Sequence, residues 1–163
     1  KIALKLAKAH HLNKEWVQKA ALLHDVAKDL SLQEKVQKAQ KLGCPFLLEE
    51  QENSELMHAP LGAFILEKEW HIKEPEILSA VKKHTTGDAL MSPIDLTIFI
   101  ADFLAGLKIG IKKTLIYRTA LKSLEKGALK VCVQKINWVL KKQKPLASKS
   151  ILCYHDLLKK VKE

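Results

Sequence analysis

Helical periodicity runs through nearly the whole of this 163-residue chain, and no stretch of useful length alternates apolar and polar residues as a half-buried strand does. This pattern constrains the fold more than any other feature, because it leaves helices as the elements that must build the core. We therefore expect an all-α protein. The predicted helices cover residues 1–9, 14–28, 31–42, 54–69, 74–86, 93–106, 111–125, 127–142 and 148–162.

Local signals support several of these helix ends. Ser92, Pro93 and Asp95 together offer an N-cap hydroxyl, a proline at the first helical position and an acid in the first turn. Gly43 and Gly87 lie where left-handed glycines commonly end a helix.

The composition is that of one globular domain. A chain of 163 residues with 47% apolar content can bury a proper core. Its apolar runs are interrupted by lysines, and its first residues lack the long apolar centre of a signal peptide, so we expect a cytoplasmic protein without a membrane span. The three cysteines are odd in number and unpatterned, which argues against a disulfide framework and predicts reduced thiols.

The formal charge of +10 comes entirely from the last third of the chain. Residues 1–107 have a net charge of −2, whereas residues 108–163 have a net charge of +12. Such a region can attract phosphates, nucleic acid or an acidic surface, or can simply present solvated lysine faces. Because no aromatic residues alternate with the lysines, we do not expect a nucleic-acid ligand.

Two acids stand inside apolar helical runs. Asp25 follows His24 in the apolar run of residues 20–28. Asp102 has apolar neighbours on both sides in residues 98–104. Burying such groups without partners costs several kcal/mol. A transition-metal ion would offset this cost, because imidazole and carboxylate are both good ligands for one.

Two further histidines complete a set of potential ligands. His58 stands among small residues beside Pro60, and His84 ends a predicted helix. Each alone is typical of a hydrogen-bonded core or capping histidine. Together with His24, Asp25 and Asp102, however, they form the mixed nitrogen and oxygen ligand set of a hydrolytic metal centre in a helical bundle.

The other histidines are weaker candidates. His10 and His11 are expected at the surface and are the first replacements if a ligand is missing, and His71 follows Trp70 at a helix end. The second His-Asp pair, His155-Asp156, has basic and amphipathic surroundings, so we do not expect it to bind metal.

The order of these residues resembles that of the HD-domain metal-dependent phosphohydrolases, which are named after their His-Asp pair. Over roughly residues 1–142, the chain is similar to one branch, the YqeK-type symmetrical bis(5'-nucleosyl)-tetraphosphatases. The similar strings are His24-Asp-x-Ala-Lys28, His58-Ala-Pro-Leu-Gly-Ala63, His84-Thr-Thr-Gly87 and Ile100-Ala-Asp102.

The resemblance implies a fold, a cofactor and a reaction. The fold would be an HD-domain helical bundle of residues 1–163, with a metal-binding core at about 14–106 and basic C-terminal helices at about 108–163. The cofactor would be two metal ions, with iron suggested by the family and manganese or another transition metal as alternatives. The reaction would be symmetrical hydrolysis of diadenosine tetraphosphate to two ADP by a metal-activated water.

Roles for individual residues follow from the same resemblance. Asp25 would bridge the two metals, with His58 and His84 on one ion and His24 and Asp102 on the other. Lys28, one helical turn after the His-Asp pair, would stabilise charge on the phosphoryl oxygens, so Asp25 and Lys28 are the predicted catalytic residues. Thr85 and Thr86 would hydrogen-bond a phosphate or a ligand histidine, or simply cap the helix.

The chain departs from the branch at two places. A further histidine ligand of the family would fall about five residues before Lys1, so we expect the chain to lack its natural start. The Glu-Pro-x-Arg segment that follows the last aspartate in the branch is absent, and lysine cannot reproduce the bidentate phosphate contact of that arginine. Lys108, Lys112 and Lys113 are the nearby point charges.

These departures keep two other functions open. One is an HD phosphohydrolase that acts on another nucleotide, such as a nucleoside monophosphate or an alarmone. The other is a non-catalytic regulatory HD module attached to a nucleotidyltransferase. The oligomeric state is also open, with a homodimer as the alternative to a monomer.

Overall fold

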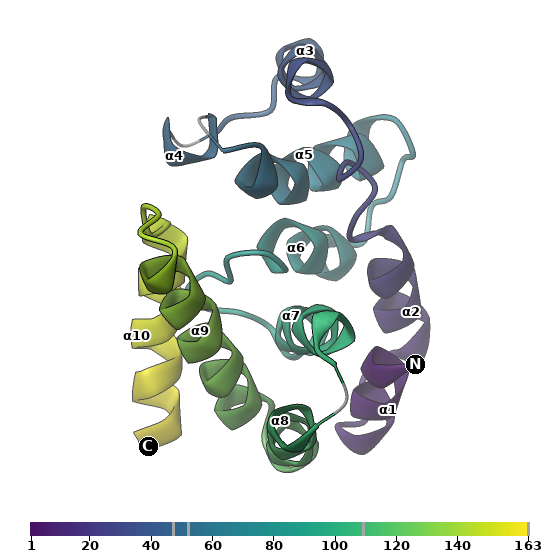
Figure 1. Cartoon of the computed structure of the whole chain (residues 1–163). Coiled ribbons are helices and arrows are strands. Elements are labelled where there is room, and N and C mark those ends of the chain that lie inside the picture. The colour runs from purple at the N-terminus through teal and green to yellow at the C-terminus, as the bar shows by residue number, and fades with distance from the viewer. Residues whose placement is uncertain (47, 52, 109, 163) are drawn as a thin grey trace.

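The computed structural model describes residues 1–46, 48–51, 53–108 and 110–162. Within these ranges the chain forms ten helices and no strand, which confirms the all-α prediction (Figure 1). The helices are α1 (Ile2–Ala9), α2 (Lys14–Leu23), α3 (Leu32–Leu42), α4 (Leu48–Gln51), α5 (Ser54–Lys68), α6 (Pro75–Lys83), α7 (Pro93–Gly106), α8 (Ile111–Lys122), α9 (Leu124–Lys141) and α10 (Ser148–Lys162).

Helices α5, α6 and α7 are stacked through the middle of the molecule (Figure 1). Helices α1 and α2 lie along one side of this stack, where α2 packs against both α6 and α7. On the other side α9 packs against α7, with α10 outside it. Helix α3 packs on α5, and α8 contacts α9, α1 and α7. Helices α2, α6 and α7 are thus mutual neighbours, because each packs against the other two.

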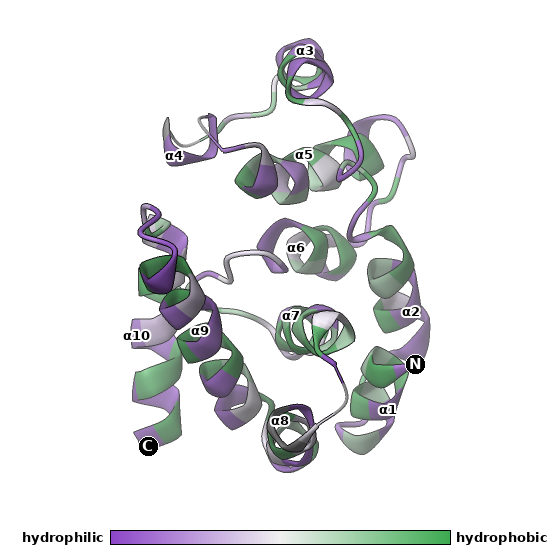
Figure 2. Ribbon diagram, viewed as in Figure 1, coloured by the Kyte–Doolittle hydropathy of each residue, from purple (hydrophilic) through white to green (hydrophobic). Residues whose placement is uncertain are grey.

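Helix α7 is the centre of the core. Every residue from Ile94 to Ile100 is buried, and Figure 2 shows this helix mainly in hydrophobic colours. Phe99 and Leu104 belong to a large cluster that joins α7 to α1, α8, α9 and α10. The predicted start of the helix is confirmed, because the Ser92 hydroxyl and the Asp95 carboxylate form a capping box around Pro93.

Several predicted boundaries were wrong. Helix α2 ends at Leu23 and not at residue 28, because Val26 and Lys28 donate to carbonyls three residues earlier, as in tight turns. Helix α6 ends at Lys83, three residues before the predicted end. The short helix α4 was not predicted, and the break between α8 and α9 falls at Ser123. His24 and His84 thus both occupy C-cap positions.

Both glycines are left-handed as predicted, but only Gly43 ends its helix. Gly43 ends α3 with φ of 65°, and Gly87 has φ of 69° in the turn after α6. The three cysteines are free and buried. Among the described residues, no helix is both long and apolar enough to cross a membrane.

Candidate metal centre

The five predicted ligands converge from four parts of the chain. His24 is the C-cap of α2 and Asp25 follows it, His58 lies in the second turn of α5, His84 is the C-cap of α6, and Asp102 lies on α7. Single donor atoms of His24, Asp25 and His84 lie within 4.8 Å of one another. Helix packing therefore collects residues that are up to 78 positions apart in the sequence.

Each of the three imidazoles is oriented by a main-chain carbonyl three residues before it. The Nδ1 atoms lie 2.9 Å from the Ala21 oxygen for His24, 2.6 Å from the Glu55 oxygen for His58 and 2.7 Å from the Val81 oxygen for His84. Carbonyl oxygens only accept, so each Nδ1 carries a proton, and in the neutral imidazole each Nε2 presents a lone pair. Such bonds are the usual support of metal-binding histidines.

The three Nε2 atoms surround the Asp25 carboxylate. Asp25 Oδ1 lies 3.4 Å from His84 Nε2 and 3.5 Å from His58 Nε2, and Asp25 Oδ2 lies 3.5 Å from His24 Nε2. Asp25 Oδ1 is buried and has no hydrogen-bond partner in the described part of the chain. A buried oxygen without a donor is costly, so this atom fits a cation.

The spacing of two lone pairs leads to the same conclusion. His58 Nε2 and His84 Nε2 are 3.0 Å apart, and both are acceptors. Two imidazole nitrogens at about 2.1 Å from one ion, at a right angle, would be about 3.0 Å apart. The residues therefore fit a metal ion between His58, His84 and Asp25.

Burial and neighbouring charges hold Asp25 and His58 in the protonation states that bind metal. Burial favours the neutral carboxyl of Asp25, but its contacts with His84 and Lys28 outweigh burial and lower its pKa. Burial lowers the pKa of His58 to about 4, with a further contribution from the charge of His84. Both groups are thus deprotonated at neutral pH.

His24 and Asp102 form a second pair of candidate ligands, at the edge of this cluster. His24 Nε2 lies 3.5 Å from Asp102 Oδ1. Burial favours neutral His24, but Asp102 and Asp25 outweigh burial and raise its pKa. In Asp102, burial is outweighed by the hydrogen bond to His24 and the charge of Lys135, so its pKa is lowered.

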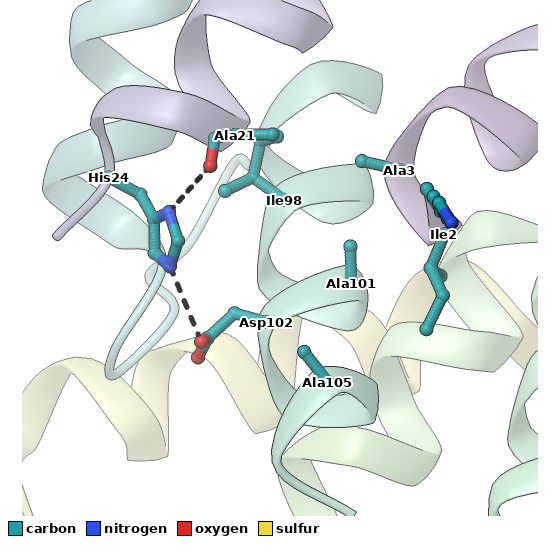
Figure 3. Close-up of a pocket in the computed structure, with 9 residues that line it drawn as sticks. Ile2, Ala3, Ala21, His24, Ile98, Ala101, Asp102 and Ala105 are labelled. Atoms are coloured by element: carbon teal, nitrogen blue, oxygen red, sulfur yellow. Dashed lines mark hydrogen bonds and ion pairs between the residues drawn. The ribbon is translucent and has the colours of Figure 1, made fainter.

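The two carboxylates are less buried than the apolar sequence around them predicts. The side chain of Asp25 is 32% exposed and that of Asp102 is 29% exposed, and Asp102 borders two cavities. One cavity is lined by His24 and Asp102 and by small apolar side chains of α1, α2 and α7 (Figure 3). A second cavity of about 360 Å³ lies on the other side of Asp102 and is lined by Lys28, Lys35, Ser54, Glu55, His58, His84, Thr85 and Asp102.

Of the three predicted substrate-binding residues, Lys28 and Thr85 contact the candidate ligands and Thr86 does not. Lys28 Nζ lies 2.7 Å from Asp25 Oδ2, and the Thr85 hydroxyl lies 3.1 Å from both His58 Nε2 and His84 Nε2. The Thr86 hydroxyl instead donates to the Gly87 carbonyl. Of the lysines after Asp102, Lys113 donates to the Leu107 carbonyl, and the side chain of Lys112 lies outside the described part.

Lys135 is a residue of the site that the sequence did not indicate. It lies on α9, and its Nζ donates to the main-chain oxygens of His84 at 3.1 Å and Thr85 at 2.8 Å. The same Nζ is 3.8 Å from Asp102 Oδ2 and 4.6 Å from the centre of the Phe99 ring. It therefore ties two ligand-bearing segments together. It stands in an ordinary amphipathic helix, so only the fold reveals it.

The other histidines lie away from the ligand cluster. His10 Nε2 contacts the Ala120 carbonyl at 2.6 Å, which joins α1 to α8. His11 and His71 have left-handed backbone conformations at helix ends. His155 is exposed on α10, and Asp156 accepts from the Leu90 amide and pairs with Lys160.

A sequence model of the HD domain matches residues 1–107 of the chain, which include all five converging ligands. The chain belongs to the HD domain family. Membership implies dependence on a divalent metal, and the group formed by His24, Asp25 and His84 is a possible site for it. Helices α8 to α10, including Lys135, lie beyond the matched residues.

Relatives of this HD-domain protein include two enzymes named symmetrical bis(5'-nucleosyl)-tetraphosphatase. The one from Halalkalibacterium halodurans is 32% identical over 160 residues, which cover 96% of this chain and 83% of that protein. The one from Bacillus subtilis is 26% identical over 156 residues, with coverages of 96% and 83%. A crystal structure of an HD superfamily hydrolase from Clostridium acetobutylicum, described as involved in NAD metabolism, superposes with a TM-score of 0.90 at 26% identity over 97% of this chain and 84% of that one.

Proposed function

We propose that this HD-domain protein is a metal-dependent phosphohydrolase that cleaves diadenosine tetraphosphate symmetrically into two molecules of ADP. The observation that carries this proposal is the convergence of the His58 and His84 lone pairs on the partnerless Asp25 Oδ1. The choice of substrate follows the names of the symmetrical tetraphosphatases that are similar to this chain.

The donor set supports two ions. Asp25, His58 and His84 would hold one ion, and His24 with Asp102 would hold the other, with Asp25 between them. Imidazole and carboxylate ligands suit iron and manganese alike, and we propose iron. When bound, such ions polarise phosphoryl oxygens and lower the pKa of the attacking water to near neutrality.

Lys28 and Thr85 would act on the substrate itself. The side chain of Lys28 is 54% exposed, and an ammonium group has three donors, of which one contacts Asp25. The remaining donors can stabilise negative charge that develops on the phosphoryl oxygens. The Thr85 hydroxyl lines the same cavity and can donate to a phosphate oxygen once metal occupies the two histidine lone pairs.

The products of diadenosine tetraphosphate test this proposal. With iron or manganese under reducing conditions, the protein should release ADP alone, separated by ion-exchange chromatography. Asp25→Ala should lose turnover and most metal binding, whereas His155→Ala, in the second His-Asp pair, should keep both. Release of AMP together with ATP would contradict the assignment, and loss of metal from His155→Ala would show that the wrong pair was chosen.

A different nucleotide substrate is the second candidate function. Residues 103–110 follow Asp102 where the branch has its Glu-Pro-x-Arg segment, so this chain lacks the arginine that could clamp a phosphate. Comparison of kcat/KM for diadenosine tetraphosphate with those for nucleoside monophosphates and alarmones decides between the two.

A further inference from the structure

Lys35 is a buried cation that the chemistry described above does not use. It lies on α3 with a relative exposure of 4%. Its Nζ donates to the Lys28 carbonyl at 2.9 Å and to the Ser54 hydroxyl at 3.0 Å, which leaves one of its three hydrogens. Among the described residues, no carboxylate oxygen lies within the 4.0 Å of an ion pair.

A buried ammonium group without a counter-charge is unfavourable. Burial lowers the pKa of Lys35, although the charge of Asp29 opposes the shift. An anion beside Nζ would oppose the effect of burial, because it would supply a counter-charge and accept the remaining hydrogen. The local chemistry of Lys35 therefore favours an anionic ligand.

The location of Lys35 indicates which anion this is. Lys35 and Ser54 line the 360 Å³ cavity whose other walls include His58, His84 and Asp102. Lys28 connects the two ends, since its side chain contacts Asp25 and its carbonyl contacts Lys35. A chain of phosphates with one group at the metal ligands would thus extend toward Lys35.

We propose that Lys35 and Ser54 form a phosphate subsite that binds the part of a polyphosphate chain remote from the metal centre. This inference rests on the proposed function and extends it to chain length. An orthophosphate or a monophosphate ester fills only the metal end of the cavity, whereas a tri- or tetraphosphate also reaches the subsite. Lys35 thereby selects long phosphate chains.

Calorimetric titration of the Mn²⁺-loaded protein with inorganic tripolyphosphate and with orthophosphate tests the subsite. Lys35→Met should weaken tripolyphosphate binding by roughly tenfold or more, since a hydrogen bond from a charged donor is lost. Orthophosphate and Mn²⁺ affinities should change less than twofold. Lys41→Met, an exposed lysine on the same helix, should leave all three affinities unchanged.

Ser54→Ala provides a second variant in which Lys35 is intact. It should weaken tripolyphosphate binding by roughly threefold to tenfold, as expected for one hydrogen bond from an uncharged donor. If circular dichroism shows that Lys35→Met is unfolded, the affinity of Ser54→Ala for tripolyphosphate decides whether the subsite exists. Wild-type affinity for tripolyphosphate in a folded Lys35→Met or in Ser54→Ala, or an equal loss of orthophosphate affinity, would overturn the subsite. These titrations need no turnover, so they remain decisive if diadenosine tetraphosphate is not hydrolysed.

Discussion

Gly87 is the position where a single methyl group should perturb the site most. It ends the turn His84-Thr85-Thr86-Gly87, and an ideal Cβ there would lie 2.5 Å from Cys153 Sγ and 3.1 Å from Cys153 Cβ. Its φ of 69° is itself unfavourable for alanine, by about 1–2 kcal/mol. Overpacking against the buried Cys153 adds about 1–3 kcal/mol, so Gly87→Ala should lose about 2–5 kcal/mol of unfolding free energy.

Gly43→Ala is the matched control. Gly43 has nearly the same φ, 65°, but nothing lies within 4 Å of its ideal Cβ. Its alanine variant should therefore lose only the backbone contribution of about 1–2 kcal/mol. The difference between the two variants measures the contact with Cys153.

Urea denaturation of Gly87→Ala, Cys153→Ala and the double variant completes the test. Removing Sγ makes room for the new methyl group, so the double variant should be more stable than the sum of the single losses by about 1–3 kcal/mol. Equal losses in Gly87→Ala and Gly43→Ala, together with an additive double variant, would show that packing against Cys153 does not constrain this turn.

Two further predictions concern charged groups at the site. Lys135→Met should lower the unfolding free energy of the metal-free protein by about 1–3 kcal/mol in urea denaturation, because the His84 and Thr85 carbonyls lose a charged donor. Lys130 is exposed on the same helix, so Lys130→Met should stay within about 0.5 kcal/mol of wild type. Equal losses in the two variants would contradict the role of Lys135. His58 has a pKa of about 4 in the folded protein against 6.5 in the unfolded chain, so the unfolded chain binds more protons between these values. As the pH falls from 6.5 to 4, protonation of His58 should therefore lower the unfolding free energy by about 3 kcal/mol. NMR titration of His58 in the metal-free protein checks the direction, and a midpoint at or above 6.5 would contradict it.

The fold was largely predictable because its elements are specified locally. Capping residues around Pro93 and the left-handed Gly43 were visible as sequence signals, and both are confirmed. The end of α2 was not predictable, because the apolar pattern continues beyond Leu23 through Val26 and Ala27, which pack inward from the turn that follows. Periodicity reports burial, and here buried residues continue after the helix has stopped.

The candidate ligands were predictable from the sequence, but two lysines near them were not. Polar residues in apolar settings identified all five candidates, His24, Asp25, His58, His84 and Asp102, and the family pattern then assigned them roles. Lys135 and Lys35 escaped because a lysine on an amphipathic helix is normally a solvated one, and only tertiary packing buries its ammonium group. Their partners are main-chain carbonyls and a serine hydroxyl, which leave no charge pattern in the sequence.

The carbonyl contacts at Ala21, Glu55 and Val81 make the direction of each imidazole independent of the distances between the imidazoles. Because each imidazole is aimed by a residue three positions before it, its tautomer and direction are set within one helical turn. The distances between the imidazoles depend instead on how α2, α5 and α6 pack. Core substitutions in these helices can therefore retune which metal ion fits best while every ligand keeps its identity and its aim.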